Sequence, residues 1–139
     1  MKQLFLITLL LITGFNINAQ SKAKIKSQKI KLVTVWESRY KTSNAKEHKE
    51  SVSKFDQNGN LVDVITYDNT GKFKEHISYK YNKNNKKTNE TYYDTKGNVI
   101  KIIKYTYNEK NLKTEKKVYD GNNKLKSKKR YIYESRVSD

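Results

Sequence analysis

The stretch YDTKGNVIKIIKYTYNEKNLKTEKKVY, from Tyr93 to Tyr119, decides the fold of this chain. It spans one 26-residue unit of two unequal halves, because aromatic residues recur along the chain at alternating gaps of 12 and 14 residues. The aromatic series is Phe55, Tyr67, Tyr81, Tyr93, Tyr107, Tyr119 and Tyr133. Self-similarity at such a period marks a repeat architecture, in which each unit buries its apolar residues against its neighbours.

Turn-forming residues follow each aromatic residue at fixed positions. Asp or Asn comes directly afterwards, and Gly or Asn comes three positions later, giving the pairs Asp56 and Gly59, Asp68 and Gly71, Asn82 and Asn85, Asp94 and Gly97, Asn108 and Asn111, and Asp120 and Asn123. Asp and Asn cap backbone N–H groups at the start of a type I turn, and Gly and Asn tolerate a positive φ. The pattern therefore predicts bulged β-hairpin connections.

The segments between these turns predict strands. In 73–81, 99–107 and 125–133, apolar and aromatic residues alternate with polar ones, which is typical of a half-buried antiparallel sheet. We expect an all-β fold, an antiparallel β-meander of about seven to nine strands in an open, twisted or curled sheet. A small closed barrel is the alternative geometry, because closure removes exposed edges.

The ends of the chain differ from this repeat. Residues 1–19 have the pattern of a secretory signal peptide, with Lys2 before an apolar run and Ala19 at a plausible cleavage point. We expect a polar, flexible leader over 20–29, a degenerate hairpin or cap over 30–54, repeats over 55–133 and a tail over 134–139. The chain has no Cys, and hence no lipoprotein acylation site and no disulfide, so it is predicted to be periplasmic or extracellular and not an integral membrane protein.

The formal net charge is +16, and nearly all of the basic residues are lysines. Such a surface attracts polyanions, so lipopolysaccharide and acidic polysaccharides are candidate partners outside the cytoplasm. Arg occurs only at Arg39, Arg130 and Arg136, which argues against specific recognition of duplex DNA. Alternatively, the lysines only solvate an open sheet and prevent pairing of its edges.

Three segments carry a resemblance to a known family. Residues 55–61 (FDQNGNL), 67–71 (YDNTG) and 93–97 (YDTKG) resemble the YD repeats of Rhs-type proteins, and the likeness covers about residues 55–133. That resemblance implies β-hairpin repeats and carbohydrate binding. The alternating 12- and 14-residue gaps, and Asn at turn positions 85, 111 and 123, depart from the family pattern. Small exported proteins with double repeats in Bacteroidetes-type bacteria are the more similar group.

The side chains needed for catalysis are scarce. Only His48 and His76 could serve as imidazole bases, and both are expected to be solvated surface residues. The recurring Asp residues alternate with Asn at the same turn position, so that position needs a capping oxygen and not a charge. We therefore expect no enzyme activity, no metal site and no cofactor.

One constellation favours binding, the Tyr-x-Tyr pairs that end three strands. They are Tyr79 and Tyr81, Tyr105 and Tyr107, and Tyr131 and Tyr133, with charge offered by Lys80, Lys104, Lys128 and Arg130. An exposed aromatic ladder could stack sugar rings, although the same tyrosines could instead fill a shallow core. The leading hypothesis is an exported, envelope-associated binding module for glycans or anionic polymers. The alternative is a scaffold that pairs through its sheet edges with itself or with another β-repeat protein.

Overall fold

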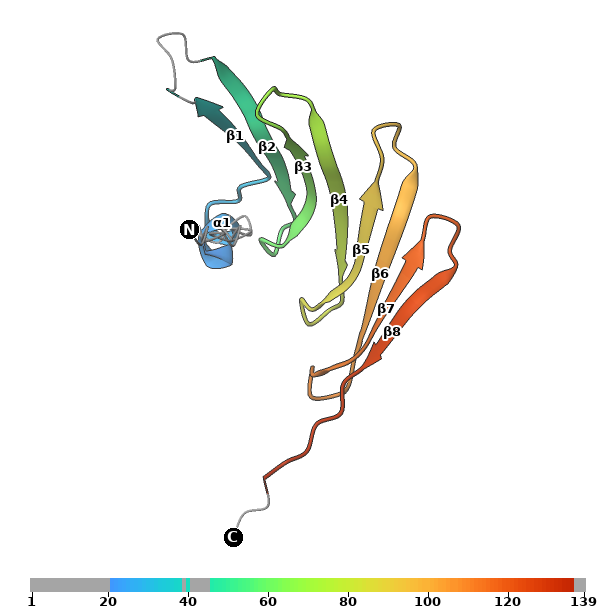
Figure 1. Ribbon diagram of the computed structural model, residues 1–139. Coiled ribbons are helices and arrows are strands. Elements are labelled where there is room, and N and C mark those ends of the chain that lie inside the picture. The colour runs from blue at the N-terminus through green and yellow to red at the C-terminus, as the bar shows by residue number, and fades with distance from the viewer. Residues whose placement is uncertain (1–20, 39, 41–45, 137–139) are drawn as a thin grey trace, which may run out of the picture.

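The computed structural model describes residues 21–38, 40 and 46–136. These residues form one antiparallel sheet of eight strands that follow one another in chain order (Figure 1). The strands are β1 (Leu32–Ser38), β2 (Glu47–Phe55), β3 (Leu61–Tyr67), β4 (Phe73–Tyr81), β5 (Lys87–Tyr93), β6 (Val99–Tyr107), β7 (Lys113–Asp120) and β8 (Leu125–Arg130). The predicted all-β meander is therefore confirmed.

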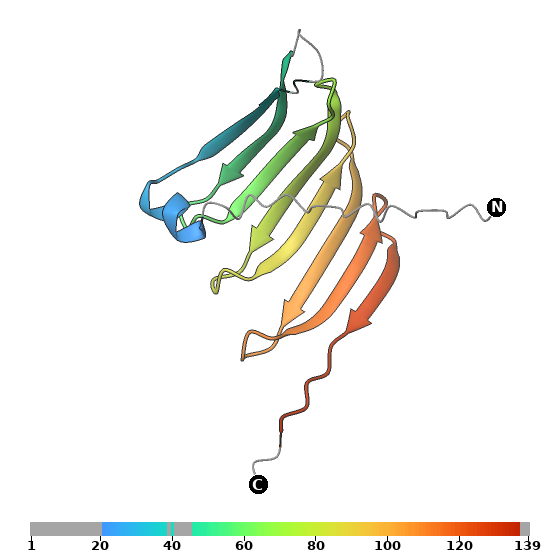
Figure 2. The same ribbon diagram turned by 60° about the vertical axis from the view of Figure 1, so that its left-hand side comes forward.

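The sheet is open and not closed into a barrel. Strands β1 and β8 stand at its opposite edges, and each pairs with only one neighbour among the described residues (Figure 2). The predicted signal peptide and the last three residues of the predicted tail lie outside the described residues.

One turn geometry connects all strands from β2 onward. In the turn after β3, the Gly71 N–H donates to the Asp68 carbonyl at 2.9 Å, and the Asp68 N–H donates to the Lys72 carbonyl at 2.8 Å. The five other turns repeat these bonds. The fourth turn residue has a φ between 56° and 84° in each case, at Gly59, Gly71, Asn85, Gly97, Asn111 and Asn123. The turns also shift the register by one residue at each hairpin, and such bulges increase the right-handed twist.

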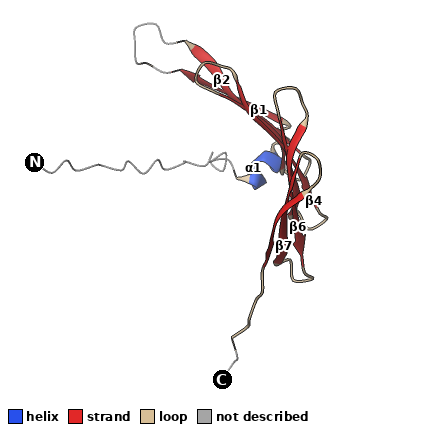
Figure 3. Cartoon of the chain, turned by 45° about the vertical axis from the view of Figure 1, so that its right-hand side comes forward, coloured by secondary structure: helices blue, strands red, loops and turns tan. Residues whose placement is uncertain are grey.

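The sheet is a single layer, as its nearly edge-on view shows (Figure 3). Among the described residues, the buried apolar side chains of the strands are only Val64, Ile77 and Ile103. Most other strand residues are half-buried by neighbouring side chains of the same sheet. Lateral contacts between long side chains therefore take the place of a second layer.

A short helix covers one end of this sheet, where the sequence predicts a flexible leader. Helix α1 (Lys22–Ser27) begins at Ser21, whose hydroxyl oxygen accepts a hydrogen bond from the Lys24 N–H at 3.3 Å. Its apolar residues are Ala23 and Ile25, and the Ile25 side chain is buried, with 3% of its surface exposed. The helix backbone rests on the first turn, because a Cβ at Gly59 would lie 2.6 Å from the Lys22 carbonyl oxygen.

Gly59→Asn tests the contact between α1 and this turn. Asn already occupies the equivalent positive-φ position at Asn85 and Asn111, so its backbone cost is small, but its side chain would displace the helix. We expect a loss of about 1–3 kcal/mol in the free energy of unfolding, measured in urea. Gly97→Asn is the matched control, because a Cβ at Gly97 meets nothing within 4 Å. Equal losses in the two variants would contradict the helix contact.

Candidate functional site

The three Tyr-x-Tyr pairs lie on one face of the sheet, which we call the tyrosine face. Residues that are directly opposite each other on neighbouring strands have their side chains on the same face. Tyr79 is opposite Glu90, and Tyr105 is opposite Lys116, so these side chains belong to the tyrosine face. The predicted basic partners Lys80, Lys104, Lys128 and Arg130 occupy the alternate strand positions and project from the opposite face. The structure therefore does not bring these basic residues together with the tyrosine pairs.

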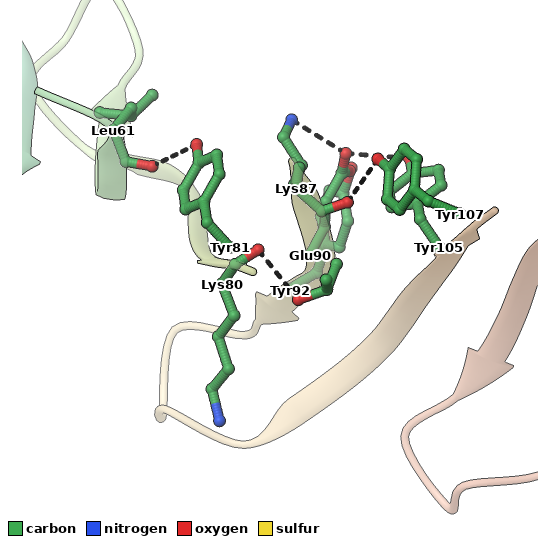
Figure 4. A network of polar contacts seen from close by, with 9 residues as sticks. Leu61, Lys80, Tyr81, Lys87, Glu90, Tyr92, Tyr105 and Tyr107 are labelled. Atoms are coloured by element: carbon green, nitrogen blue, oxygen red, sulfur yellow. Dashed lines mark hydrogen bonds and ion pairs between the residues drawn. The ribbon is translucent and has the colours of Figure 1, made fainter. Parts of the chain in front are cut away.

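The second tyrosine of each pair is a structural tie. The hydroxyls of Tyr81, Tyr107 and Tyr133 donate to the carbonyls of Leu61, Lys87 and Lys113, at 2.7, 2.6 and 2.7 Å. Each acceptor lies 20 residues earlier, on the neighbouring strand and just past the last residue pair of the ladder between the two strands. Figure 4 shows the contacts of Tyr81 and Tyr107. The tyrosine hydroxyl thus satisfies a carbonyl where strand pairing ends.

A half-buried carboxylate, that of Glu90 on β5, joins two strands at the centre of the tyrosine face. Glu90 accepts hydrogen bonds from the Lys87 ammonium at 3.1 Å, the Tyr92 hydroxyl at 2.9 Å and the Tyr105 hydroxyl at 3.0 Å (Figure 4). Burial acts to raise the pKa of Glu90, but the Lys87 charge and the three hydrogen bonds outweigh it and hold the pKa below its usual range. The same carboxylate, together with burial, raises the pKa of Tyr105.

Lysines from β5, β6 and β7 lie over tyrosine rings. The ammonium of Lys87 is 4.4 Å from the centroid of Tyr79, and that of Lys113 is 4.5 Å from the centroid of Tyr105. Lys101 lies 3.5 Å from the ring centroid of Tyr92. These cation–π contacts cover ring faces that an open stacking platform would leave free. Sequence reasoning missed them, because the pairs form only once the cross-strand register is known.

The tyrosine face is hollowed between α1 and the first tyrosine pair. This cleft, which we call the α1 cleft, has a volume of about 490 Å³. It is lined by Lys22, Ile25, Phe55, Gly59, Asn60, Leu61, Val64, Thr66, Glu75, Ile77, Tyr79, Tyr81 and Asn85. Burial, with smaller effects of nearby carboxylates, raises the pKa of Tyr79 to about 12, so its hydroxyl remains a donor at neutral pH.

Some polar groups of the α1 cleft remain available to a ligand. Within the described residues, neither the Tyr79 hydroxyl nor the Glu75 carboxylate has a hydrogen-bond partner, and Lys22 forms no ion pair. The Asn60 amide donates to Asn85 Oδ1 at 2.9 Å, which leaves the Asn85 amide N–H groups free. The cleft thus offers donors and acceptors beside aromatic and aliphatic walls.

The two histidines lie on the sheet and are not free in solvent. His76 Nε2 lies 2.9 Å from Asp63 Oδ2, and its ring stacks on Tyr93 at 4.6 Å between centroids. The Ser78 hydroxyl forms a hydrogen bond with the Tyr93 hydroxyl at 3.0 Å. A catalytic serine would instead form a hydrogen bond with the histidine that acts as its base. His48 lies 3.4 Å from Glu37. The expectation of solvated histidines was therefore wrong, since both are half-buried and paired.

Comparisons with known proteins identify no family. No family model matches the chain, and no curated protein matches it. Among solved structures, the chain is similar to one described as the crystal structure of the GtfA/B complex bound to UDP and GlcNAc, with a TM-score of 0.30 and 12% sequence identity. The match covers 66% of this chain and 23% of that chain. A likeness this weak carries no conclusion about function.

No helix in the part of the chain that the structure describes has the length and hydropathy needed to cross a membrane. No group of three or more His, Cys, Asp or Glu side chains there could hold a metal ion.

Tyr107→Phe tests the structural tie. The change removes the hydroxyl and leaves the Lys87 carbonyl without its donor, so we expect a loss of about 1–2 kcal/mol in the free energy of unfolding, measured by thermal and urea unfolding. Tyr119→Phe is the matched control on the opposite face, where no described residue bonds to the hydroxyl. If Tyr107→Phe and Tyr119→Phe have the same free energy of unfolding, the hydrogen bond of the Tyr107 hydroxyl does not stabilise the sheet.

Glu90→Gln tests the carboxylate network through pH. A lowered pKa in the folded state contributes stability that is full above the unfolded-state pKa of about 4.3 and is lost as the pH falls through the folded-state value. We expect the variant to be less stable than wild type at neutral pH, with this difference shrinking in acid. Urea unfolding across that range is the measurement, with Glu109→Gln in an exposed turn as the control. A difference that does not change with pH would contradict the role of the charge.

Proposed function

We propose that this chain is a non-enzymatic, exported binding module of the cell envelope that holds a neutral glycan in the α1 cleft. The observation that carries the proposal is the set of free polar groups in that cleft, beside the rings of Tyr79 and Tyr81. A sugar presents hydroxyls that both donate and accept hydrogen bonds, together with C–H surfaces that pack on aromatic and aliphatic walls. Pockets of this composition are typical of small-molecule sites.

A neutral glycan fits this cleft better than an anionic polymer does. Glu75 lines the cleft, and Glu90 lies nearby on the same face, so a phosphate or carboxylate ligand would meet negative charge. On the tyrosine face, Lys87 and Lys113 lie over tyrosine rings, and Lys87 is also paired with Glu90. Lys22 is the cleft's one cation among the described residues, and it could serve as a hydrogen-bond donor.

The sequence supports export, and side-chain contacts on the sheet support a protein that binds without catalysing a reaction. The signal-peptide pattern of residues 1–19 and the lack of Cys support a periplasmic or extracellular protein. The engagement of Ser78 with Tyr93, and of both histidines with carboxylates, supports binding without chemistry.

Tyr79→Phe separates binding from folding. The variant keeps the ring and loses a hydroxyl that bonds to no described residue, so we expect unchanged thermal stability. Neutral oligosaccharides that bind the protein are first identified on a bacterial glycan array. Their affinity, measured by calorimetry, should be about tenfold lower in Tyr79→Phe, which corresponds to the loss of one hydrogen bond. Glu75→Gln should weaken binding similarly, and Tyr119→Phe on the opposite face should not.

Salt distinguishes this proposal from generic charge attraction. Binding of a neutral glycan should persist at high ionic strength, whereas binding of lipopolysaccharide or acidic polysaccharide through surface lysines should weaken steeply. The proposal fails if no neutral glycan binds, or if binding is the same in Tyr79→Phe and wild type. Binding only to polyanions, lost at high salt, would also overturn it.

A further inference from the structure

The two open edges of the sheet belong to different classes of strand. Strands β2, β4, β6 and β8 begin at residues 47, 73, 99 and 125, a constant step of 26, and they form the first class of strand. Strands β3, β5 and β7 form the second class, and β1 takes the same place beside β2 that β3 takes beside β4. Within the described residues, one edge of the sheet is thus β8, a strand of the first class, and the other edge is β1, which stands in a second-class position.

The tyrosine pair after β8 is more exposed than the earlier pairs. Tyr79, Tyr81, Tyr105 and Tyr107 are half-buried, because a further strand follows each of these pairs. Tyr131 and Tyr133 occupy the same positions of the repeat, and Tyr133 makes the same hydroxyl tie, yet Tyr133 is 51% exposed. The last repeat is therefore built like the others, but no strand within the described residues covers it.

Apart from Ile100 and Leu112, which are 53% and 39% exposed, the large exposed apolar side chains of the described residues lie toward the same two edges. Leu32 and Trp36 on β1 are 52% and 54% exposed, and Leu125 on β8 is 48% exposed. Ile132 continues this apolar surface beyond β8. Concentration of exposed apolar side chains in such places marks an interaction surface.

Charge decides which edges can meet. Strand β8 carries the four cations Lys126, Lys128, Lys129 and Arg130, so pairing of two β8 edges would set like charges opposite one another. Strand β1 contains no Lys or Arg. The basic edge can therefore approach β1 of another copy without this repulsion.

We propose that copies of this chain associate head to tail, β8 of one copy pairing with β1 of the next. The number of strands is even, so β1 and β8 run in opposite directions. A second copy in the same orientation then presents β1 antiparallel to β8 and continues the alternation of the two classes of strand. Such a heterologous contact does not close on itself, so it produces open filaments that grow with protein concentration. This association is independent of the proposed glycan site.

The backbone amides that form this junction can be identified from the register. The Phe55 N–H donates to the Lys31 carbonyl, so residues 31 and 33 direct their backbone groups to β2 and Thr34 directs its own outward. The Tyr131 N–H donates to the Thr114 carbonyl, so by the same alternation Lys128 directs its backbone groups away from β7. Proline at either position removes one outward N–H and no backbone hydrogen bond within the sheet. Lys128→Pro also removes the ion pair of Lys128 Nζ with Glu115 Oε1 at 2.7 Å, which the Lys128→Ala variant removes as well.

Thr34→Pro and Lys128→Pro therefore block one edge each. Sedimentation velocity of the purified protein should show a wild-type mass that rises with concentration without a fixed limit. Each proline variant alone should remain a monomer, whereas an equimolar mixture should double in mass, because each variant keeps the edge that the other lacks. Formation of that mixed dimer would also show that both variants are folded. Thr34→Ala and Lys128→Ala keep the amides and should associate like wild type.

Three results would overturn the proposal. One is a wild-type protein that stays monomeric at every concentration. Another is a Lys128→Pro variant that still dimerises, which would indicate pairing of β1 with β1. The third is a mixture of the two proline variants that remains monomeric although circular dichroism shows both to be folded.

Discussion

The structure depends on one constraint: a single-layer sheet has no second layer to cover its faces. Side chains on the sheet must therefore cover one another, and this favours long residues that combine an apolar body with a polar end. Tyrosine and lysine both have this form. The rings of Tyr79 and Tyr105 lie under the ammonium groups of Lys87 and Lys113, while the Tyr107 hydroxyl satisfies a backbone carbonyl. The high content of both residues is thus a structural requirement of the fold as well as a source of charge.

The sequence predicts the repeated part of this fold because its rules are local. Asp or Asn followed by Gly or Asn fixes a turn within five residues, and alternation fixes the faces of a strand such as β6. The meander, the bounds of β4 and β6, and the shared face of Tyr79 and Tyr105 follow from these rules. The choice between an open sheet and a closed barrel does not, because closure depends on how twist accumulates over all the strands.

The features that sequence analysis missed depend on register or on contacts distant in the chain. A one-residue shift at each bulged turn decides which lysine meets which tyrosine, so the position of Lys87 over Tyr79 cannot be read from spacing alone. Helix α1 was missed because its six residues contain three lysines and little apolar surface. It is held by the burial of Ile25 and by close approach to Gly59, a turn residue more than 30 positions later. The pairing of His76 with Asp63 also arises between neighbouring strands.

The position of α1 bears directly on where binding chemistry can occur. Along most of the tyrosine face, lysines and tyrosines already contact one another, so a ligand there would have to displace interactions that stabilise the sheet. At the first tyrosine pair, the helix stands over the face and leaves a cleft in which Tyr79 and Glu75 retain free polar groups. A regular repeat offers equivalent surfaces in every unit, and the irregular N-terminal cap makes one of them different. The departure from the repeat, and not the repeat itself, therefore gives this chain its most specific candidate site.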